Sequence, residues 1–509
     1  MGQDAERRLL FFMLRINFDR AFENLLRELL GRGHIVTAAL DRHKAGLPDH
    51  ATYVFESLAA EYPGFSYEMA PITPNPWERL ATGLRVATDY LRYLEPAYAD
   101  ANALRARVEA RTPRWARRLA ALPVVKTARG RAILDRLLRM GERSLPPADW
   151  IRSYMEAFAP DVILVTPLVG VGSSQGDYIR VARELGIPSV LPVASWDNLS
   201  NKGVIRDQPD RTIVWNPAQL EEAASLQRLP AETTFATGAH SWDHWFDWVP
   251  STTFAEFTRR RGLAPDQALI LYVCSSNFIA SDEVDFVREW LERLRSSGDP
   301  RLRDAGVILR PHPQNTVMWA DTEFGDPRAL VWPREGAAPT NDERKNDYYD
   351  SLHHASAVVG INTSAQVEAA IVRTPVLTLL LDRFHETQQA TLHFSHLRDL
   401  LIVADSWETH LAQLSEALAG PADTHDERLN GFVRTFIRPN GLDTAAAPAA
   451  ADLIEAAAGL SVPAPRTGLL AHVMRWMTPM VERRERRRRA QLKAKSSRSV
   501  NSGRAPSRP

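Results

Sequence analysis

Three polar residues, Asn362-Thr363-Ser364, follow the apolar run at residues 357–361 and precede a helical pattern. A strand end that leads into a helix exposes backbone N–H groups and the positive end of the helix dipole, and hydroxyl side chains there add donors. That combination suits a phosphate. Glu368 lies four residues after Ser364 on the same helix face, where its carboxylate could accept hydrogen bonds from ribose hydroxyls. An ordinary helix N-cap accounts for the hydroxyls equally well when this stretch is considered alone.

A second candidate phosphate site is the turn Arg310-Pro311-His312-Pro313, which follows the apolar residues 307–309. Two prolines make a rigid turn at the carboxyl end of a strand, where open α/β sheets bind their ligands. Arg310 can neutralise a phosphate oxygen, and His312 can donate a hydrogen bond to one. A solvated turn is the alternative. Ser275 and Ser276 form a weaker candidate after another apolar run, because small hydroxyl residues let the backbone approach an anion.

The stretch SWDNLSNKG at residues 195–203 is too polar and aromatic for a plain turn after an apolar strand. Asp197 could act as a general base towards an acceptor hydroxyl. We interpret Trp196, Asn198 and Lys202 as acceptor contacts. A self-capping Asx turn is the competing explanation.

Two further residues are candidates for the catalytic base. Asp19 in RINFDRAFENLL lies just past the first apolar run, although a helix N-cap is its more ordinary role. His240 in TGAHSWDHWF lies where the last strand of the first half ends. The pairs His353-His354 and His393-x-x-His396 lack further ligands at metal spacing, so we expect no metal site. No serine elbow or Walker motif is present, which excludes the commonest hydrolases and P-loop proteins.

Short apolar runs bounded by turn residues alternate with helical patterns, which is typical of parallel α/β proteins. We expect two doubly wound Rossmann-like domains with a boundary at residues 248–264. The first domain covers 1–250 and carries an Arg-rich helical insertion at about 76–154; the second covers 265–425, and closing helices occupy 426–460. The expected strands are residues 9–16, 35–40, 162–166, 189–193, 211–215, 233–237, 268–274, 306–309, 329–332, 357–361, 376–380 and 401–403.

The formal net charge of the 509 residues is zero, but the charge is unevenly distributed. Residues 466–509 hold 13 Lys or Arg and two Glu, and residues 101–144 hold 12 Lys or Arg and three acids. The basic tail is expected to be amphipathic at first and disordered over its last dozen residues. Cys274 is the only cysteine, and no stretch approaches the roughly 20 apolar residues that span a bilayer. A cytoplasmic protein, held peripherally at the inner face of the membrane, is the expectation.

The RPHP turn and the strand–Asn-Thr-Ser–helix–Glu unit resemble GT-B glycosyltransferases. They are most similar to the branch with CDP-glycerol glycerophosphotransferases and related surface-polysaccharide enzymes, over roughly residues 160 to 455. The resemblance implies a cleft between two Rossmann-like domains and closing helices, near residues 438–441, that cross back to the first domain. It also implies that the His-Pro turn and the helix start at Thr363 and Ser364 contact a pyrophosphate, and that Glu368 holds a ribose. Residues 384–397 are then expected to lie near the transferred group. The implied donor contacts are His312, Thr363, Ser364, Glu368, Gln388 and Thr391.

The expected activity is transfer of a group from a nucleotide-sugar or CDP-alditol donor to a hydroxyl of a glycan or lipid-linked acceptor. The donor is a substrate, and no cofactor is expected. A UDP-sugar 2-epimerase-like isomerase and a non-catalytic nucleotide-sugar-binding scaffold at the membrane are the alternatives. The basic segments interleave Arg with Trp, Leu and Met, which favours an anionic membrane surface as a partner. No nucleic-acid-binding fold accompanies them, so no specific nucleic acid is expected.

Overall fold

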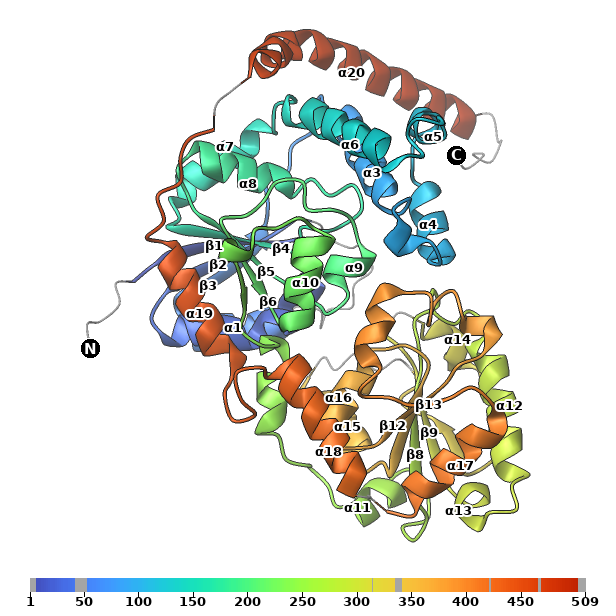
Figure 1. Cartoon of the computed structure of the whole chain (residues 1–509). Coiled ribbons are helices and arrows are strands. Elements are labelled where there is room, and N and C mark those ends of the chain that lie inside the picture. The colour runs from blue at the N-terminus through green and yellow to red at the C-terminus, as the bar shows by residue number, and fades with distance from the viewer. Residues whose placement is uncertain are drawn as a thin grey trace.

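Two parallel β-sheets, each covered by helices, form the two domains of the chain (Figure 1). The structure is a computed structural model that describes residues 6–41, 53–313, 315–334, 341–420, 423–465 and 468–501. Every strand pairing in both sheets is parallel. The predicted fold class, two doubly wound α/β domains with a helical insertion in the first, is therefore confirmed.

The first sheet has seven strands in the order β3-β2-β1-β4-β5-β6-β7. Buried aliphatic and aromatic side chains fill its central strands, as expected where helices cover both faces. The strands are β1 (Arg8–Met13), β2 (Ile35–Leu40), β3 (Phe65–Met69), β4 (Val162–Thr166), β5 (Ser189–Pro192), β6 (Arg211–Val214) and β7 (Thr234–Ala236). The helices of this domain outside the insertion are α1 (Asp19–Gly31), α2 (Tyr53–Glu61), α7 (Asp149–Phe158), α8 (Gly176–Glu184), α9 (Asn198–Asn201) and α10 (Pro217–Ser225).

The second sheet has six strands in the order β10-β9-β8-β11-β12-β13. This order places the turns after β8, β9 and β11 side by side at one edge, where the predicted donor residues lie. The strands are β8 (Leu269–Val273), β9 (Gly306–Arg310), β10 (Ala329–Val331), β11 (Ala357–Gly360), β12 (Val376–Leu379) and β13 (Ile402–Ala404). The helices are α11 (Phe254–Arg259), α12 (Glu283–Arg295), α13 (Pro300–Arg303), α14 (Val317–Ala320), α15 (Asp342–His353), α16 (Ala365–Ile371) and α17 (Trp407–Leu418).

The insertion forms four helices with a small core of their own: α3 (Glu78–Arg92), α4 (Asn102–Glu109), α5 (Arg114–Ala120) and α6 (Ala128–Arg143). The expected insertion extends to residue 154, but α7 packs into the core of the first sheet through Ile151, Tyr154 and Met155. Figure 1 shows α4 at the end of the insertion that faces the second domain.

The chain returns to the first domain after the second sheet. Helix α18 (Asp423–Phe432) continues through a π-helical turn (Val433–Ile437), and α19 (Ala446–Ala457) then packs into the first-domain core. Arg32 on α1 pairs with Asp452 at 2.7 Å and with Glu455 at 3.0 Å. The closing helices therefore cross back from the second domain to the first, as the resemblance implied, and they connect the two domains.

The basic tail forms one helix, α20 (Leu469–Asn501), which lies over the insertion (Figure 1). Its Met474, Met477 and Val481 pack near Trp77 and Leu145. Disorder of the last dozen residues was expected, but the helix continues to residue 501; residues 502–509 lie outside the described part. Within the described residues, no helix is long and apolar enough to cross a membrane.

Most strand predictions agree with the structure to within one residue at each end. The first strand was expected to reach residue 16, but it ends at Met13, and a 3-10 helix (Ile16–Phe18) leads into α1. Strand β3 was missed. It is an edge strand with a single fully buried residue, Phe65, so its sequence carries little hydrophobic pattern.

Candidate active site between the two domains

Three adjoining cavities of about 270, 210 and 250 Å³ lie between the two domains, and Ser364 lines all of them. The 270 Å³ cavity lies beside the Asp197 loop, and Lys202 and Thr391 line it. The 210 Å³ cavity is lined by the RPHP turn. The 250 Å³ cavity has five tryptophans in its wall. Most of the predicted donor and acceptor residues therefore meet in one cleft.

The start of α16 presents the Ser364 hydroxyl to the cleft rather than to its own helix. Ser364 is the N-cap residue, but its side chain makes no capping hydrogen bond. Its Oγ instead accepts a hydrogen bond of 3.1 Å from Nε1 of Trp196, across the domain boundary. The Thr363 backbone N–H is already bonded to Oε1 of Gln366 at 3.1 Å, so it is not free for a ligand. The N-cap explanation is thus wrong for Ser364, and the contribution of this turn comes from its hydroxyls.

Glu368 lies between side chains of both domains. Its Oε1 accepts a hydrogen bond of 3.2 Å from Nε1 of Trp242 in the first domain, and its Oε2 accepts one from the Tyr348 hydroxyl on α15. Burial raises the pKa of Glu368, and the hydrogen bonds from Tyr348 and Trp242 oppose that rise. The carboxylate keeps lone pairs for further donors and lines two of the cavities.

The RPHP turn brings His312 and Arg310 to the 210 Å³ cavity. Burial lowers the pKa of His312 to about 4, so the imidazole is neutral at pH 7 and can donate one hydrogen bond. Arg310 is buried and bound to Asp347 at 2.9 Å and to the Ser351 hydroxyl at 2.8 Å. Its positive charge is therefore partly compensated within the second domain, and it acts on the cavity mainly through its field.

The Asp197 loop is built around an ion pair. The Lys202 Nζ lies 2.7 Å from the carboxylate, and the Ser195 hydroxyl donates to it at 2.8 Å. Burial alone would raise the pKa of Asp197, but Lys202, the nearby His393 and the Ser195 hydroxyl hold it well below its usual range. Such a carboxylate is a weak base and a good anchor.

The insertion holds this loop in place. The Arg92 guanidinium donates to the carbonyl oxygens of Leu199, Lys202 and Gly203, and the Tyr93 hydroxyl donates to that of Lys202 at 2.9 Å. Two further bonds come from Tyr98 and Arg107 to the carbonyls of Ser200 and Asn201. Arg107 and Leu104 of α4 also line the 270 Å³ cavity. The insertion is therefore part of the cleft and not only an appendage of the first domain.

No protein-family model and no curated protein sequence matches the chain. Solved structures give matches of low identity. One is a putative UDP-N-acetylglucosamine 2-epimerase from Listeria monocytogenes, with 12% identity over 87% of this chain and 94% of that chain and a TM-score of 0.49. Another is the glycotransferase of kitacinnamycin, with 15% identity over 89% and 99% and a TM-score of 0.47. A third is the UDP-GlcNAc 2-epimerase of Neisseria meningitidis bound to UDP-GlcNAc, with 10% identity over 88% and 99% and a TM-score of 0.47.

Five predicted site residues line none of the three cavities: Asp19, Asn198, His240, Ser275 and Gln388. Gln388 is buried, and its amide donates to the Ile361 carbonyl and the Thr378 hydroxyl. Ser275 is fully buried, and its backbone N–H donates a hydrogen bond to the Glu283 carboxylate. Asn198 bonds to Asp197 at 3.2 Å, and His240 packs against the Phe22 ring. In this structure these side chains support the loops of the cleft instead of facing it, while Ser276 does line the 270 Å³ cavity.

Asp19 begins α1 next to Arg20, which lines two of the cavities, but Asp19 itself lines none of them. It is almost fully buried, and burial raises its pKa to about 6 even though the adjacent Arg20 lowers it. Arg20 was not predicted. Its side chain lines two cavities together with Glu368, and within the described residues its guanidinium makes no hydrogen bond or ion pair. The sequence could have indicated Arg20, because it directly follows Asp19, a candidate base just past the first strand.

Aromatic residues form the other unpredicted part of the cleft. Trp215 and Trp242 meet edge to face at a centroid distance of 5.0 Å, and Trp245 and Trp248 do so at 5.4 Å. The sequence HSWDHWFDW carries three of these residues, but nothing in their spacing shows that they share a wall with Trp196. Such a wall suits stacking against the apolar face of a ring. Within the described residues, no group of three or more His, Cys, Asp or Glu is arranged to hold a metal ion.

Proposed function

We propose that this protein is a GT-B-type transferase that moves a sugar or alditol phosphate from a nucleotide diphosphate donor to a hydroxyl acceptor. The observation that carries the proposal is that side chains of both domains line the same cavities. Ser364 lines all three of them, and each of His312, Glu368, Arg20 and Trp196 lines two. The first three belong to the second domain and the last two to the first. A transferase needs donor and acceptor groups on facing walls, and this cleft supplies both.

On the donor side, three groups are proposed to stabilise the phosphate charge of the departing nucleotide. Arg20 supplies a cation that no carboxylate in the described residues pairs with, His312 supplies a neutral N–H, and Ser364 supplies a hydroxyl. Preorganised donors of this kind stabilise charge that develops as the leaving group departs. Glu368 is then available to the ribose hydroxyls, as expected from its position on α16.

On the acceptor side, the pKa of Asp19 suits a base better than that of Asp197, although only Asp197 lines a cavity of the cleft in this structure. A base works best when its pKa lies near the working pH, and burial brings the pKa of Asp19 to about 6. Asp197 is paired with Lys202 and keeps its negative charge. In the proposed reaction Asp19 takes the proton of the acceptor hydroxyl and the acceptor oxygen bonds to the transferred group. A nucleoside diphosphate leaves when a sugar is transferred, and a nucleoside monophosphate leaves when an alditol phosphate is transferred.

The acceptor is proposed to be a glycan or a lipid-linked glycan at an anionic membrane. Of the 19 large apolar side chains that are exposed in the described residues, 13 lie on the insertion or on α20, so exposed apolar surface is concentrated there. Val473, Trp476 and Met480 form an outward stripe on α20, and Arg-rich turns follow it. An exposed apolar stripe with basic flanks is typical of a helix that lies in a membrane interface.

The donor assignment is tested by a thermal-shift screen with UDP-, GDP-, CDP- and dTDP-linked compounds, followed by calorimetry on the best ligand. We expect His312→Ala and Glu368→Ala to weaken binding by about tenfold each, since each removes hydrogen bonds to a charged or polar ligand group. His353→Ala and Glu292→Ala are matched controls, because both residues are exposed in the same domain and line none of the three cavities. Equal binding by all four variants would overturn the donor site.

Turnover then separates the proposed reaction from its alternatives. A transferase releases a nucleoside diphosphate or, for an alditol phosphate donor, a nucleoside monophosphate only when an acceptor is supplied. A 2-epimerase would convert a UDP-sugar without any acceptor and exchange its C2 hydrogen with solvent. A scaffold would bind the donor without changing it, and either result would exclude transfer as the main activity.

A further inference from the structure

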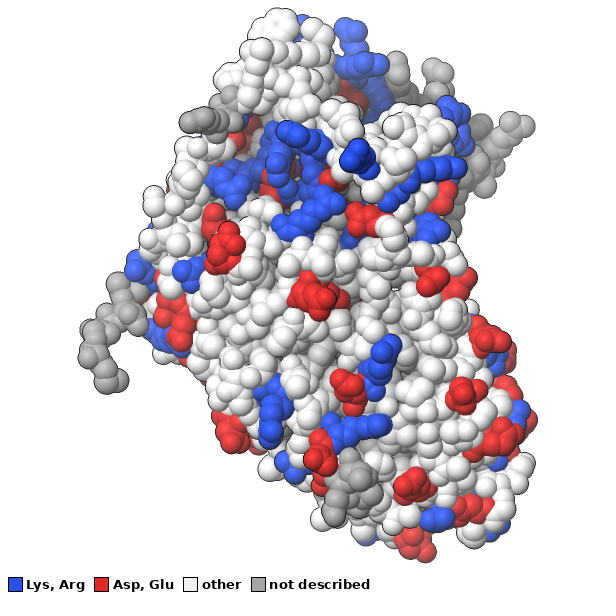
Figure 2. Space-filling model, in the orientation of Figure 1, with Lys and Arg blue, Asp and Glu red and all other residues white. Residues whose placement is uncertain are grey.

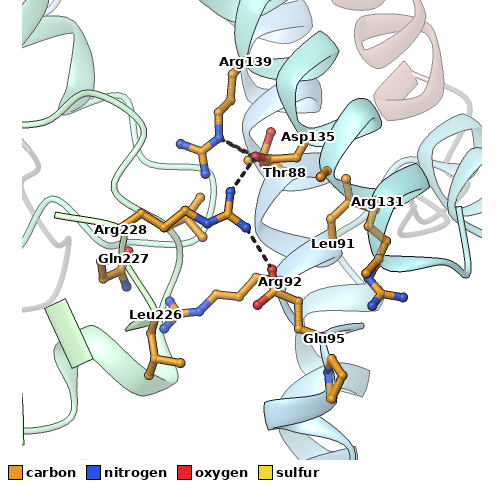
Figure 3. A pocket seen from close by; sticks show the side chains of 14 residues that line it. Thr88, Leu91, Arg92, Glu95, Arg131, Asp135, Arg139, Leu226, Gln227 and Arg228 are labelled. Atoms are coloured by element: carbon orange, nitrogen blue, oxygen red, sulfur yellow. Dashed lines mark hydrogen bonds and ion pairs between the residues drawn. The ribbon is translucent and has the colours of Figure 1, made fainter. Parts of the chain in front are cut away.

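A separate cavity of about 220 Å³ lies where the insertion meets the first domain (Figure 3). Its wall is formed by α3, α6 and the turn at residues 226–228 after α10. It shares no lining residue with the three cavities of the cleft. The proposed transfer reaction therefore gives it no role.

The cavity is lined by charged residues with an excess of arginine. The lining holds the four arginines Arg92, Arg131, Arg139 and Arg228, and only two acids, Glu95 and Asp135. The wall therefore has a net charge of two positive. Figure 2 shows Lys and Arg gathered around a hollow on the face where the insertion lies against the first domain.

The two acids do not compensate all four arginines. Arg228 lies between the carboxylates of Asp135 and Glu95, at 3.4 Å from each (Figure 3). Arg139 also binds Asp135, at 3.0 Å. Both carboxylates are therefore occupied by these two arginines, and the long contacts of Arg228 can be exchanged for those of a better acceptor.

The other two arginines have no carboxylate partner in the described residues. Arg131 donates only to the Lys126 carbonyl, at 2.7 Å. Arg92 is 3% exposed, donates only to carbonyl oxygens, and has its Nε buried without a hydrogen-bond partner. An Nε this deeply buried does not touch a ligand in the cavity, so Arg92 acts on an anion there through its positive charge.

We propose that this cavity binds the phosphate dianion of a small phosphomonoester. A guanidinium group matches phosphate with two parallel N–H bonds, and two uncompensated charges match a dianion. The volume is below the roughly 300 to 1,000 Å³ of pockets for drug-sized ligands, so a whole nucleotide sugar does not fit. Leu91, Pro96 and Leu226 give an apolar wall for a short organic group.

The site is coupled to the cleft through Arg92. This residue lines the cavity and also holds the carbonyls of Leu199, Lys202 and Gly203. An anion in the cavity attracts the positive charge of Arg92, and this attraction restrains the side chain that fixes the Asp197–Lys202 loop. Occupancy of the cavity therefore slows the opening of that loop.

The experiment titrates the full-length protein with inorganic phosphate and with glycerol 3-phosphate by calorimetry. The double variant Arg131→Gln/Arg228→Gln is compared with Arg118→Gln/Arg136→Gln, which removes the same charge from exposed positions of the insertion that make no ion pair in the described residues. We expect wild type and control to bind alike and the first double variant to bind about tenfold or more weakly. Equal affinity of all three proteins, or no binding to wild type, overturns the proposal.

Two further measurements keep the result specific. Hydrogen exchange of residues 198–204 should slow in wild type with saturating glycerol 3-phosphate and stay unchanged in Arg131→Gln/Arg228→Gln; identical exchange in both would refute the coupling. Vesicles with and without phosphatidic acid test whether the phosphomonoester belongs to a lipid headgroup. If the two double variants differ in binding only on vesicles with phosphatidic acid, the site is assigned to a lipid headgroup. If they differ in their affinity for glycerol 3-phosphate in solution, the site is assigned to a free metabolite.

Discussion

Glu283 links burial to the pH dependence of stability in the second domain. It begins α12, is fully buried, and accepts the Ser275 backbone N–H at 2.9 Å on both carboxylate oxygens. The Tyr272 hydroxyl adds a third bond at 3.0 Å. These bonds fix the turn that presents Ser276 to the cleft. Burial nevertheless dominates and raises the pKa of Glu283 from 4.5 to about 8, so the carboxyl is mostly protonated at pH 7.

The size of the effect follows from linkage. The folded state binds the Glu283 proton more tightly than the unfolded state, so this contribution is complete below about pH 4.5 and is lost as pH rises towards 8. The full difference in pKa corresponds to about 5 kcal/mol, of which about 2.5 kcal/mol is lost between pH 6 and pH 9. Burial raises the pKa values of Tyr272 and Cys274 well above their usual values, so these neighbours remain protonated in that range.

The perturbation is Glu283→Gln, which keeps the shape and an acceptor oxygen but cannot ionise. Urea unfolding followed by circular dichroism at pH 6 and pH 9 gives the free energy of unfolding of each protein. We expect the variant to gain about 2.5 kcal/mol relative to wild type between the two pH values. Glu292→Gln, at an exposed position of the same helix, should show no such gain. A pH-independent difference between Glu283→Gln and wild type would show that the carboxyl is not held protonated by burial.

Three other predictions concern the base, the domain connection and the tail. Turnover should rise as the pH passes through about 6, because Asp19 must lose its proton to act as the base. Asp19→Asn should remove this pH-dependent rise and lower turnover about 100-fold or more. An unchanged pH profile in the variant would exclude Asp19 as the base. Arg32→Ala should lower the free energy of unfolding by about 1 kcal/mol in urea, because it removes the ion pairs with Asp452 and Glu455. Unchanged stability would show that these two ion pairs do not help to hold α19. Deletion after Leu460 should reduce sedimentation with anionic vesicles, since each basic residue near such a surface contributes about 1 kcal/mol; equal sedimentation would exclude α20 as the anchor.

The fold could be read from the sequence because its strands are buried on both faces. Runs such as residues 162–166 are apolar throughout and end at turn residues, so both the strands and their parallel arrangement follow from local pattern. The carboxyl-edge position of the RPHP turn and of Ser364 follows from the same rule. Strand β3 was not predicted because one side of this edge strand is exposed. Its alternation of Phe, Tyr and Met with polar residues is too short to distinguish a strand from a loop.

The parts of the site that could not be predicted depend on contacts between distant residues. Ser364 looked like a helix cap, and only the Trp196 side chain, 168 residues away in sequence, shows that its hydroxyl faces the cleft. The Arg-rich insertion looked like a surface feature, because no local pattern reveals that Arg92 reaches carbonyls more than 100 residues further along the chain. Helical periodicity places a residue on a face of its helix, but it does not say what that face meets.

The two candidate bases show how the environment of a carboxyl decides its role. In the sequence Asp197 was the stronger candidate, because it lies in an unusual loop, while Asp19 looked like a helix cap. In the structure Lys202 holds the pKa of Asp197 well below its usual range, whereas burial raises that of Asp19 to about 6. Two carboxyls whose environments separate their pKa values divide the chemistry between them. Asp197 keeps its charge and anchors the loop, and Asp19 is the one that can exchange a proton near neutral pH.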